Sequence, residues 1–223
     1  MQSPTSSGTT PVAWHVFDNF IDAITIDAIA EETNKPLSYE RCGKWFTYSN
    51  KDEKKTTCND PESMGPVTSL LLDKMQGDKF VSDMEELFSI SPLQSDPLLH
   101  GGGIHICGAG GLLSIHLDYA KHKRLPLLER RLNAILYLSQ EWKEEWGGAT
   151  VLTKPDGCTV LNRVHPKPGR LFVFETNDLS YHGVEPVTCP EGVERVTLAT
   201  YYLSHIRPGV TRERALFIPN RNL

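Results

Sequence analysis

The stretch GGGIHICGAGGLLSIHLDY, residues 101–119, places two short apolar runs between glycines. Similar β-rich runs follow at close intervals up to residue 205, and Gly, Pro, Asn and Asp separate them. Short strands punctuated by turn residues are typical of antiparallel sandwiches and barrels, and not of alternating strand–helix–strand units. The sequence therefore predicts a double-sheet jelly-roll core over residues 99–208.

The residues before this core follow a different pattern. Residues 1–11 are rich in Ser, Thr and Pro, and we expect them to be disordered because they offer little to bury. The spacing of apolar residues predicts a short amphipathic helix over 22–35 and two helical stretches over 66–90, broken at Gly77. The polar segment 38–65 is predicted to be irregular or a ragged hairpin.

The chain of 223 residues is long enough for one large β-rich domain with a proper core. We expect a single domain over 12–223, mainly β with supporting helices (α+β). Within it, 12–98 supply helical support and a loop, 99–208 form the double-stranded β-helix (jelly roll), and 209–223 form a C-terminal extension.

Composition limits the partners and the compartment. The net charge of -5 argues against a partner held through its phosphates, so nucleic acid is not expected. The five cysteines show no CxxC spacing, which predicts free thiols in a reducing compartment. The N-terminus lacks the basic and apolar regions of a secretory signal, and no apolar run reaches the roughly 18 residues needed to span a bilayer. These features predict a cytoplasmic protein without a membrane partner.

A metal site is predicted from three side chains. His116 and Asp118 are two residues apart, so on a strand both point to the same face. His182 is the best third ligand, because it follows the apolar strand predicted at 169–175 and the turn after it. Two imidazoles and one carboxylate leave three positions of an octahedral ion open, which suits non-haem Fe(II) that binds a cosubstrate and O₂. A structural zinc site would instead be closed by four ligands.

The order of further motifs is equally specific. After the HxD pair come a strand with Tyr137, GG at 147–148, PKPGRLFVF at 166–174, and the distal histidine followed by Arg195. This ordered set resembles the Fe(II)/2-oxoglutarate-dependent dioxygenases. Within them it is most similar to prolyl 4-hydroxylases, especially the oxygen-sensing type that acts on hypoxia-inducible transcription factors and its microbial relatives. The resemblance covers residues 100–205.

The resemblance implies roles for single residues. The HxD pair and His182 match the iron ligands, and Arg195, 13 residues later, matches the basic residue that binds the distal carboxylate of 2-oxoglutarate. Tyr137 matches a tyrosine whose hydroxyl reaches the same carboxylate, and Thr197, on the strand face of Arg195, could donate a further hydrogen bond. Some relatives carry a tyrosine ten residues before the first ligand. Here that position is Ile106, which puts cosubstrate contacts on that side in doubt.

The chemistry that the resemblance implies needs Fe(II), 2-oxoglutarate and O₂, with ascorbate as an optional reductant. 2-Oxoglutarate would chelate the iron and be decarboxylated to succinate and CO₂, while an unactivated C–H bond is hydroxylated. The expected substrate is a prolyl residue in a protein or peptide. The alternatives are the same chemistry on a free amino acid or other small metabolite, and a non-catalytic jelly-roll binding module.

The segment 118–131 follows the metal-bearing strand and has two interpretations. It is either an ordinary polar connection or a loop that passes the mouth of the site, where Tyr119, Lys121 and Arg124 meet the substrate. The basic side chains from Lys121 to Arg131 are interpreted as a solvated face. The other histidines are interpreted as structural residues: His15, His100, His105, His122, His165 and His205.

Overall fold

The computed structural model describes residues 1–33 and 45–218. In this part of the chain the α-helices are α1 (Ala23–Thr33), α2 (Pro66–Gln76) and α3 (Asp78–Phe88), and the 3-10 helices are η1 (Pro61–Ser63) and η2 (Glu144–Trp146). The strands are β1 (Ser6–Gly8), β2 (Trp14–Phe17), β3 (Trp45–Ser49), β4 (Glu53–Cys58), β5 (Gln94–Ser95), β6 (Gly103–Cys107), β7 (Leu112–Leu117), β8 (Leu128–Tyr137), β9 (Thr150–Thr153), β10 (Val160–Val164), β11 (Leu171–Glu175), β12 (His182–Val184), β13 (Arg195–His205) and β14 (Leu216–Phe217).

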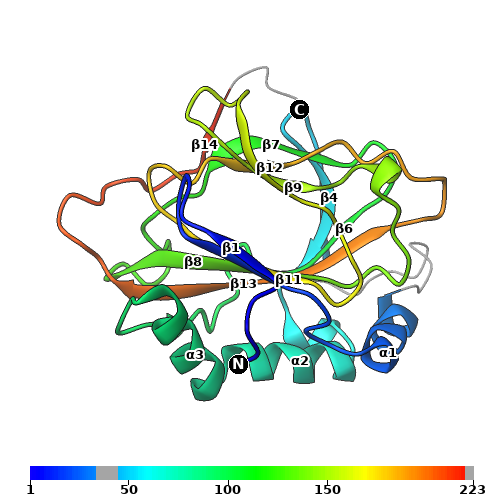
Figure 1. Cartoon of the computed structure of the whole chain (residues 1–223), viewed down its shortest axis with the longest axis horizontal. Helices are drawn as coiled ribbons and strands as arrows, with labels where there is room; N and C mark the ends of the chain where they lie inside the picture. Colours follow the sequence, from blue (N-terminus) through cyan, green and yellow to red (C-terminus); the bar gives the residue numbers. More distant parts are fainter. Residues whose placement is uncertain (34–44, 219–223) are drawn as a thin grey trace.

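The strands form one antiparallel sheet that curls on itself. Its order is β1-β2-β11-β8-β13-β6-β4-β7-β12-β9-β10, with β3 on β4, β5 on β13 and β14 on β7. Figure 1 shows two halves of this sheet facing each other, with β8 and β13 in one half and β7, β12 and β9 in the other. Helices α1, α2 and α3 cover the outer face of the half that holds β8 and β13. The predicted jelly roll with N-terminal helices is confirmed.

Strand β8 is buried on both faces because it lies between the helices and the interior of the jelly roll. Leu132, Ala134 and Leu136 pack into the helix-side cluster, while Ile135 and Tyr137 pack on the opposite face. Successive side chains of a strand point to opposite faces, which produces this division. The helix-side cluster is the larger core and also contains Phe17, Ile29, Leu72, Met75, Met84, Leu198 and Tyr202. Each fully buried large side chain contributes about 1.5–3 kcal/mol to folding.

The predicted helices form where the apolar spacing placed them. Helix α1 occupies 23–33 of the predicted 22–35, whose last two residues lie outside the described range. The break at Gly77 separates α2 from α3, because this residue has an extended backbone between them. Among the described helices, none is long and apolar enough to cross a membrane.

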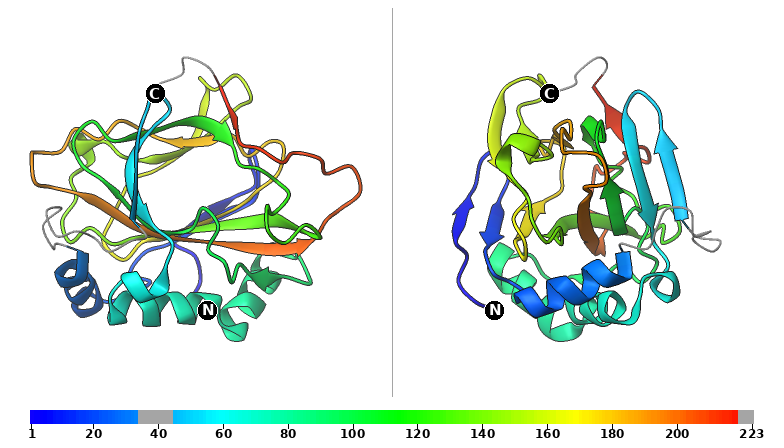
Figure 2. Two further views of the ribbon diagram at one scale, coloured as in Figure 1. Left: turned by 180° about the vertical axis from the view of Figure 1, so that it is seen from behind. Right: turned by 90° about the vertical axis from the view of Figure 1, so that its right-hand side faces the viewer.

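Two segments before the predicted core form strand pairs. Residues 1–11 are not a wholly disordered tail, because Ser6 to Gly8 form β1 and pair with β2. An edge strand is held by backbone hydrogen bonds, so its polar composition did not reveal it. The segment 38–65 was predicted to be irregular or a ragged hairpin, and the structure agrees with the hairpin, β3–β4, which has an unbroken register; residues 38–44 lie outside the described residues. Figure 2 shows this hairpin at one edge of the jelly roll and β1–β2 at the other.

The sheet also extends beyond the predicted core of 99–208. Strand β2 pairs with β11, and β4 pairs with β6 and β7, so segments from the predicted helical support complete the jelly roll. In the predicted C-terminal extension, β14 pairs with β7, and Phe217 lies opposite His116, one of the predicted iron ligands. Backbone pairing between distant segments has no sequence signal of its own, which explains the difference.

Candidate active site

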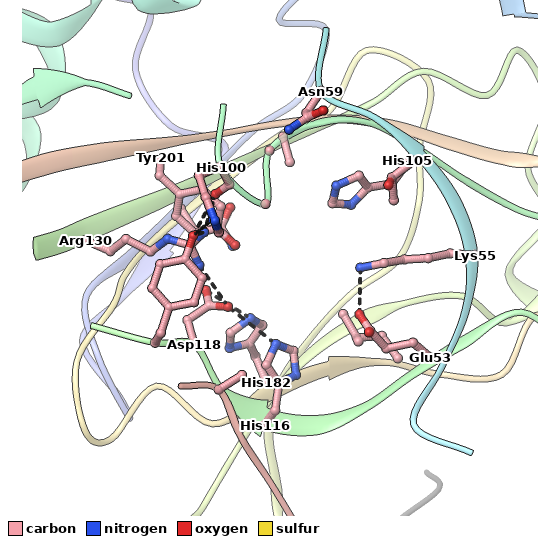
Figure 3. A pocket seen from close by; sticks show the side chains of 18 of the residues that line it. Glu53, Lys55, Asn59, His100, His105, His116, Asp118, Arg130, His182 and Tyr201 are labelled. Carbon is pink, nitrogen blue, oxygen red and sulfur yellow. Dashed lines mark hydrogen bonds and ion pairs between the residues drawn. The ribbon is translucent and has the colours of Figure 1, made fainter. Parts of the chain in front are cut away.

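The three predicted iron ligands lie together in the interior of the jelly roll. His116 is on β7, Asp118 follows the end of that strand, and His182 begins β12 directly opposite His116. His116 Nε2 is 3.6 Å from Asp118 Oδ1, and His182 Nε2 is 3.8 Å from Asp118 Oδ2. One ligand atom from each residue lies within 4.8 Å of the others, and all three side chains are buried. Figure 3 shows them converging on one point of the cavity wall.

Both imidazoles are oriented by backbone carbonyls. His116 Nδ1 donates to the carbonyl oxygen of Ser114 at 2.9 Å, and His182 Nδ1 donates to that of Ser180 at 2.8 Å. In the neutral form of each ring this tautomer places the lone pair on Nε2, the atom that lies near Asp118. Burial, with the neighbouring His116, lowers the pKa of His182 to about 4, so this imidazole is neutral at neutral pH. A neutral imidazole is the form that binds a metal ion.

Asp118 has one oxygen engaged and one without a hydrogen-bond partner. Its Oδ1 lies 3.2 Å from Nη1 of Arg130, whereas its buried Oδ2 accepts no hydrogen bond. Burial alone would raise the pKa of Asp118, but the neighbouring positive charge of Arg130 is the largest opposing effect, and the pKa lies well below its usual range. An ionised carboxylate oxygen without a partner, next to two imidazole lone pairs, fits a divalent iron ion.

Arg130 is buried, contrary to the interpretation of the basic cluster as a solvated face. Its side chain is 2% exposed, and the guanidinium carbon lies 3.7 Å from the ring centroid of Tyr119 and 3.5 Å from that of Tyr201. It also donates to the carbonyl oxygen of His100 and to the hydroxyl of Tyr119. Stacking between two aromatic rings and pairing with Asp118 offset the cost of burying this charge. No sequence spacing distinguishes the buried Arg130 from Lys123 and Arg124, which are exposed.

A second buried cation lies in the same cavity. Arg195 on β13 is 3% exposed; its Nε donates to the carbonyl oxygen of Gly148 at 2.7 Å and its Nη2 to Thr150 Oγ1 at 3.2 Å. Among the described residues, no carboxylate forms an ion pair with Arg195. Thr197 lines the cavity two residues further along the same strand. A buried guanidinium without a counter-ion fits a carboxylate group of a ligand.

Tyr137 lies behind this cation. Its hydroxyl is 2.7 Å from Thr150 Oγ1 and 3.2 Å from the carbonyl oxygen of Val164, and burial raises its pKa. Tyr137 is not among the residues that line the cavity, whereas Thr150 is. Thr150, which connects Tyr137 to Arg195, was not predicted, and its only sequence signal is its position two residues after Gly148.

The cavity holding both groups has a volume of about 1060 Å³. His105 lines it, although the sequence interpretation made this residue structural; it lies opposite Thr197 in the pairing of β6 with β13. Burial lowers the pKa of His105 well below its ordinary value, so its ring is neutral. Across the cavity from the iron ligands, Lys55 and Glu53 form an ion pair of 3.1 Å on β4 (Figure 3).

The segment 118–131 does pass this cavity. Tyr119 and Lys121 line it, while Arg124 does not. The segment is anchored by His122, whose Nδ1 accepts from the backbone N–H of Arg124 and of Leu125, at 3.2 and 3.0 Å. His122 Nε2 then donates to Asp96 at 3.2 Å, with both side chains fully buried, and His122 is also among the residues that line the cavity.

Two imidazoles and a carboxylate in a jelly roll, beside a buried cation that lacks a counter-ion, define a class: mononuclear non-haem iron enzymes with an anionic cosubstrate. Residues 102–203 match the family model of the 2OG-Fe(II) oxygenase superfamily. Over this segment the chain is similar to the Fe(II)- and 2-oxoglutarate-dependent oxygenases, a family that uses Fe(II) with 2-oxoglutarate and O₂ as cosubstrates, and His116, Asp118 and His182 could hold the iron.

Solved structures share the fold at low sequence identity. A prolyl-4-hydroxylase from Pseudomonas putida is 20% identical, with a TM-score of 0.62 over 87% of this chain and 92% of that one. A Trichoplax adhaerens prolyl hydroxylase, in complex with a peptide fragment of the hypoxia inducible factor oxygen degradation domain, is 15% identical, with a TM-score of 0.59 over 85% and 82%. The viral collagen prolyl hydroxylase of Paramecium Bursaria Chlorella virus-1, in its 2OG complex, is 16% identical, with a TM-score of 0.55 over 86% and 96%. No curated protein matches the sequence.

Proposed function

We propose that this protein is an Fe(II)/2-oxoglutarate-dependent dioxygenase that hydroxylates a prolyl residue in a protein or peptide and releases succinate and CO₂. The observation that carries the proposal is one cavity holding both an iron-type ligand cluster and the unpaired Arg195. Its volume of about 1060 Å³ is at the upper end of small-molecule sites, which leaves room for a substrate residue beside 2-oxoglutarate. The similar solved structures named above are prolyl hydroxylases, and one of them holds a peptide.

In this proposal, the iron with its cosubstrates supplies oxidative decarboxylation coupled to the insertion of one oxygen atom into a C–H bond. His116, Asp118 and His182 hold the iron. Arg130 occupies one oxygen of Asp118 and so leaves the other oxygen for the metal. Arg195 anchors the distal carboxylate of 2-oxoglutarate.

Further residues support the cosubstrate and the substrate in this proposal. Thr197 and Thr150 offer hydroxyl groups beside Arg195, and Tyr137 orients Thr150 from behind. Tyr119 and Lys121 line the entrance from the segment that follows the ligand strand. Ascorbate as an accessory reductant and a cytoplasmic location, both expected from the sequence, belong to the same proposal.

A free amino acid is the second candidate substrate. The ion pair between Glu53 and Lys55 points into the cavity opposite the iron ligands (Figure 3), and its two charges match the ammonium and carboxylate groups of an amino acid. Binding of an amino acid would replace the ion pair between Glu53 and Lys55 by two charge-assisted hydrogen bonds, one from its ammonium group to Glu53 and one from Lys55 to its carboxylate group.

The test is incubation with Fe(II), 2-oxoglutarate and proline-bearing peptides, followed by mass spectrometry and succinate assay. The proposal predicts one added oxygen atom on proline and one succinate for each hydroxylation. His182→Ala is the inactive control. If no peptide is modified while a free amino acid stimulates succinate release and is itself oxidised, the prolyl assignment fails and the second candidate replaces it.

A further inference from the structure

Two loops form one rim of the cavity mouth. The backbone N–H groups of Ala120 and Lys121 donate to the carbonyl oxygen of Arg212 at 2.9 and 3.0 Å, and Arg212 Nε donates to the carbonyl oxygen of Asp118 at 2.6 Å. These bonds join the loop after the ligand strand to residues 211–215. Side chains of this rim therefore have a fixed relation to the iron ligand Asp118.

The charges that line the cavity do not balance. Three carboxylates line it, and each has a cation beside it: Glu53 with Lys55 at 3.1 Å, Asp118 with Arg130 at 3.2 Å, and Glu213 with Lys121 at 3.6 Å. Three further cations line the cavity without an ion pair among the described residues: Lys123, Arg195 and Arg214. The cavity therefore carries an excess of positive charge, although the whole chain carries -5.

The iron and its cosubstrate do not remove this excess. The two positive charges of Fe(II) and the two negative charges of 2-oxoglutarate cancel, and Arg195 faces the distal carboxylate. Lys123 and Arg214 are then left at the rim, both exposed, with Lys123 Nζ 5.3 Å from the ring centroid of Tyr119. A mouth of one sign in a chain of the opposite sign attracts ligands of matching charge.

We propose that Lys123 and Arg214 select a substrate that carries carboxylate groups next to the oxidised C–H bond. This inference rests on the proposed function, and it names Asp or Glu residues flanking a proline as the source of these carboxylates. A free carboxylic acid has the same chemistry and is the other source to be tested. The two residues add to the expected Tyr119 and Lys121, which line the cavity, whereas Arg124 does not line it.

The expected size of the effect is modest, because both cations are exposed and solvent screens them. Each should change kcat/KM by about threefold, and together by about tenfold, at low ionic strength. At about 0.5 M salt the Debye length falls below 5 Å, and most of the preference should disappear. The effect should appear mainly in KM, since the rim binds the substrate and touches no reacting atom.

The test compares three peptides that differ only in the residues flanking one proline, which are acidic, neutral or basic. Wild-type protein should have the highest kcat/KM on the acidic peptide, and Lys123→Glu combined with Arg214→Glu should reverse the order. The neutralised pair Lys123→Ala and Arg214→Ala should abolish the preference. Lys79→Glu, a charge reversal on α3 with a side chain 84% exposed, is the matched control and should behave like wild type.

The outcomes separate this inference from the proposed function. Proline hydroxylation with the same kcat/KM on all three peptides, unaffected by the charge reversal, overturns the inference and leaves the prolyl assignment standing. If no peptide is oxidised, free mono- and dicarboxylic acids are assayed by succinate release. Oxidation of such acids that falls in the Lys123→Glu and Arg214→Glu protein supports the inference and overturns the prolyl assignment.

Discussion

Replacing Arg195 by methionine should weaken the binding of 2-oxoglutarate and leave the metal in place. The guanidinium is 3% exposed and is held by Gly148 and Thr150, so it is already positioned for a carboxylate. Removing one partner of a buried, hydrogen-bonded charge pair costs about 2–5 kcal/mol. At about 3 kcal/mol, the dissociation constant of 2-oxoglutarate rises about a hundredfold. Titration calorimetry on Mn(II)-loaded protein without O₂ measures this directly.

Two variants make this measurement specific. Arg163→Met removes an exposed arginine paired with Glu185 at 2.7 Å outside the cavity, and it should bind 2-oxoglutarate like wild type. Arg195→Lys keeps the charge but loses the fork-shaped donor, so its affinity should be intermediate. A change of less than about fivefold in Arg195→Met, with metal content and circular dichroism unchanged, would refute the reasoning.

Three further predictions follow from the same site. Gly148 has a φ of +70°, and in Gly148→Ala the new Cβ would lie 2.9 Å from Cδ of Arg195. The guanidinium should therefore be displaced, which should lower the affinity for 2-oxoglutarate about tenfold without loss of metal. Equal affinities of variant and wild type would contradict the placement of Arg195. Arg130→Met should lower the free energy of unfolding of the metal-free protein by about 3–5 kcal/mol, because it leaves Asp118 buried without its ion-pair partner. The loss should be smaller with Mn(II) bound, because the metal then neutralises Asp118. Denaturant titrations with and without metal measure both values. The free energy of unfolding of the metal-free protein should fall as the pH drops from 6.5 to about 4. Folding lowers the pKa of His182 to about 4, so in this range the unfolded chain binds the proton and the folded protein does not. Urea midpoints that do not change across this range would be inconsistent with a buried, neutral His182.

Local patterns predicted much of the fold. The break at Gly77, the apolar spacing of the helices and the short strands between turn residues all depend on near neighbours in the chain. The spacing of His116 and Asp118 specified a shared direction, and the fold brought His182 opposite His116. Strand β1 was missed because an edge strand needs only backbone partners.

The residues that the sequence did not reveal owe their position to tertiary packing. Arg130 stands in a run of basic residues, and only the rings of Tyr119 and Tyr201 above and below its guanidinium make it a buried partner of the site. His105 turns into the cavity because its strand alternates around the buried Ile106. Arg214 is distant from the ligands in sequence and reaches the cavity through the joined loops.

The central claim is that His116 belongs to a three-residue iron site that drives 2-oxoglutarate turnover. The most direct test measures bound iron and 2-oxoglutarate decarboxylation in His116→Ala beside wild-type protein, with circular dichroism to show that the variant is folded. This substitution leaves the ion pair of Asp118 with Arg130 intact. Wild-type protein should retain iron and form succinate, whereas the folded variant should do neither. A folded His116→Ala protein with wild-type iron content and decarboxylation would contradict the central claim.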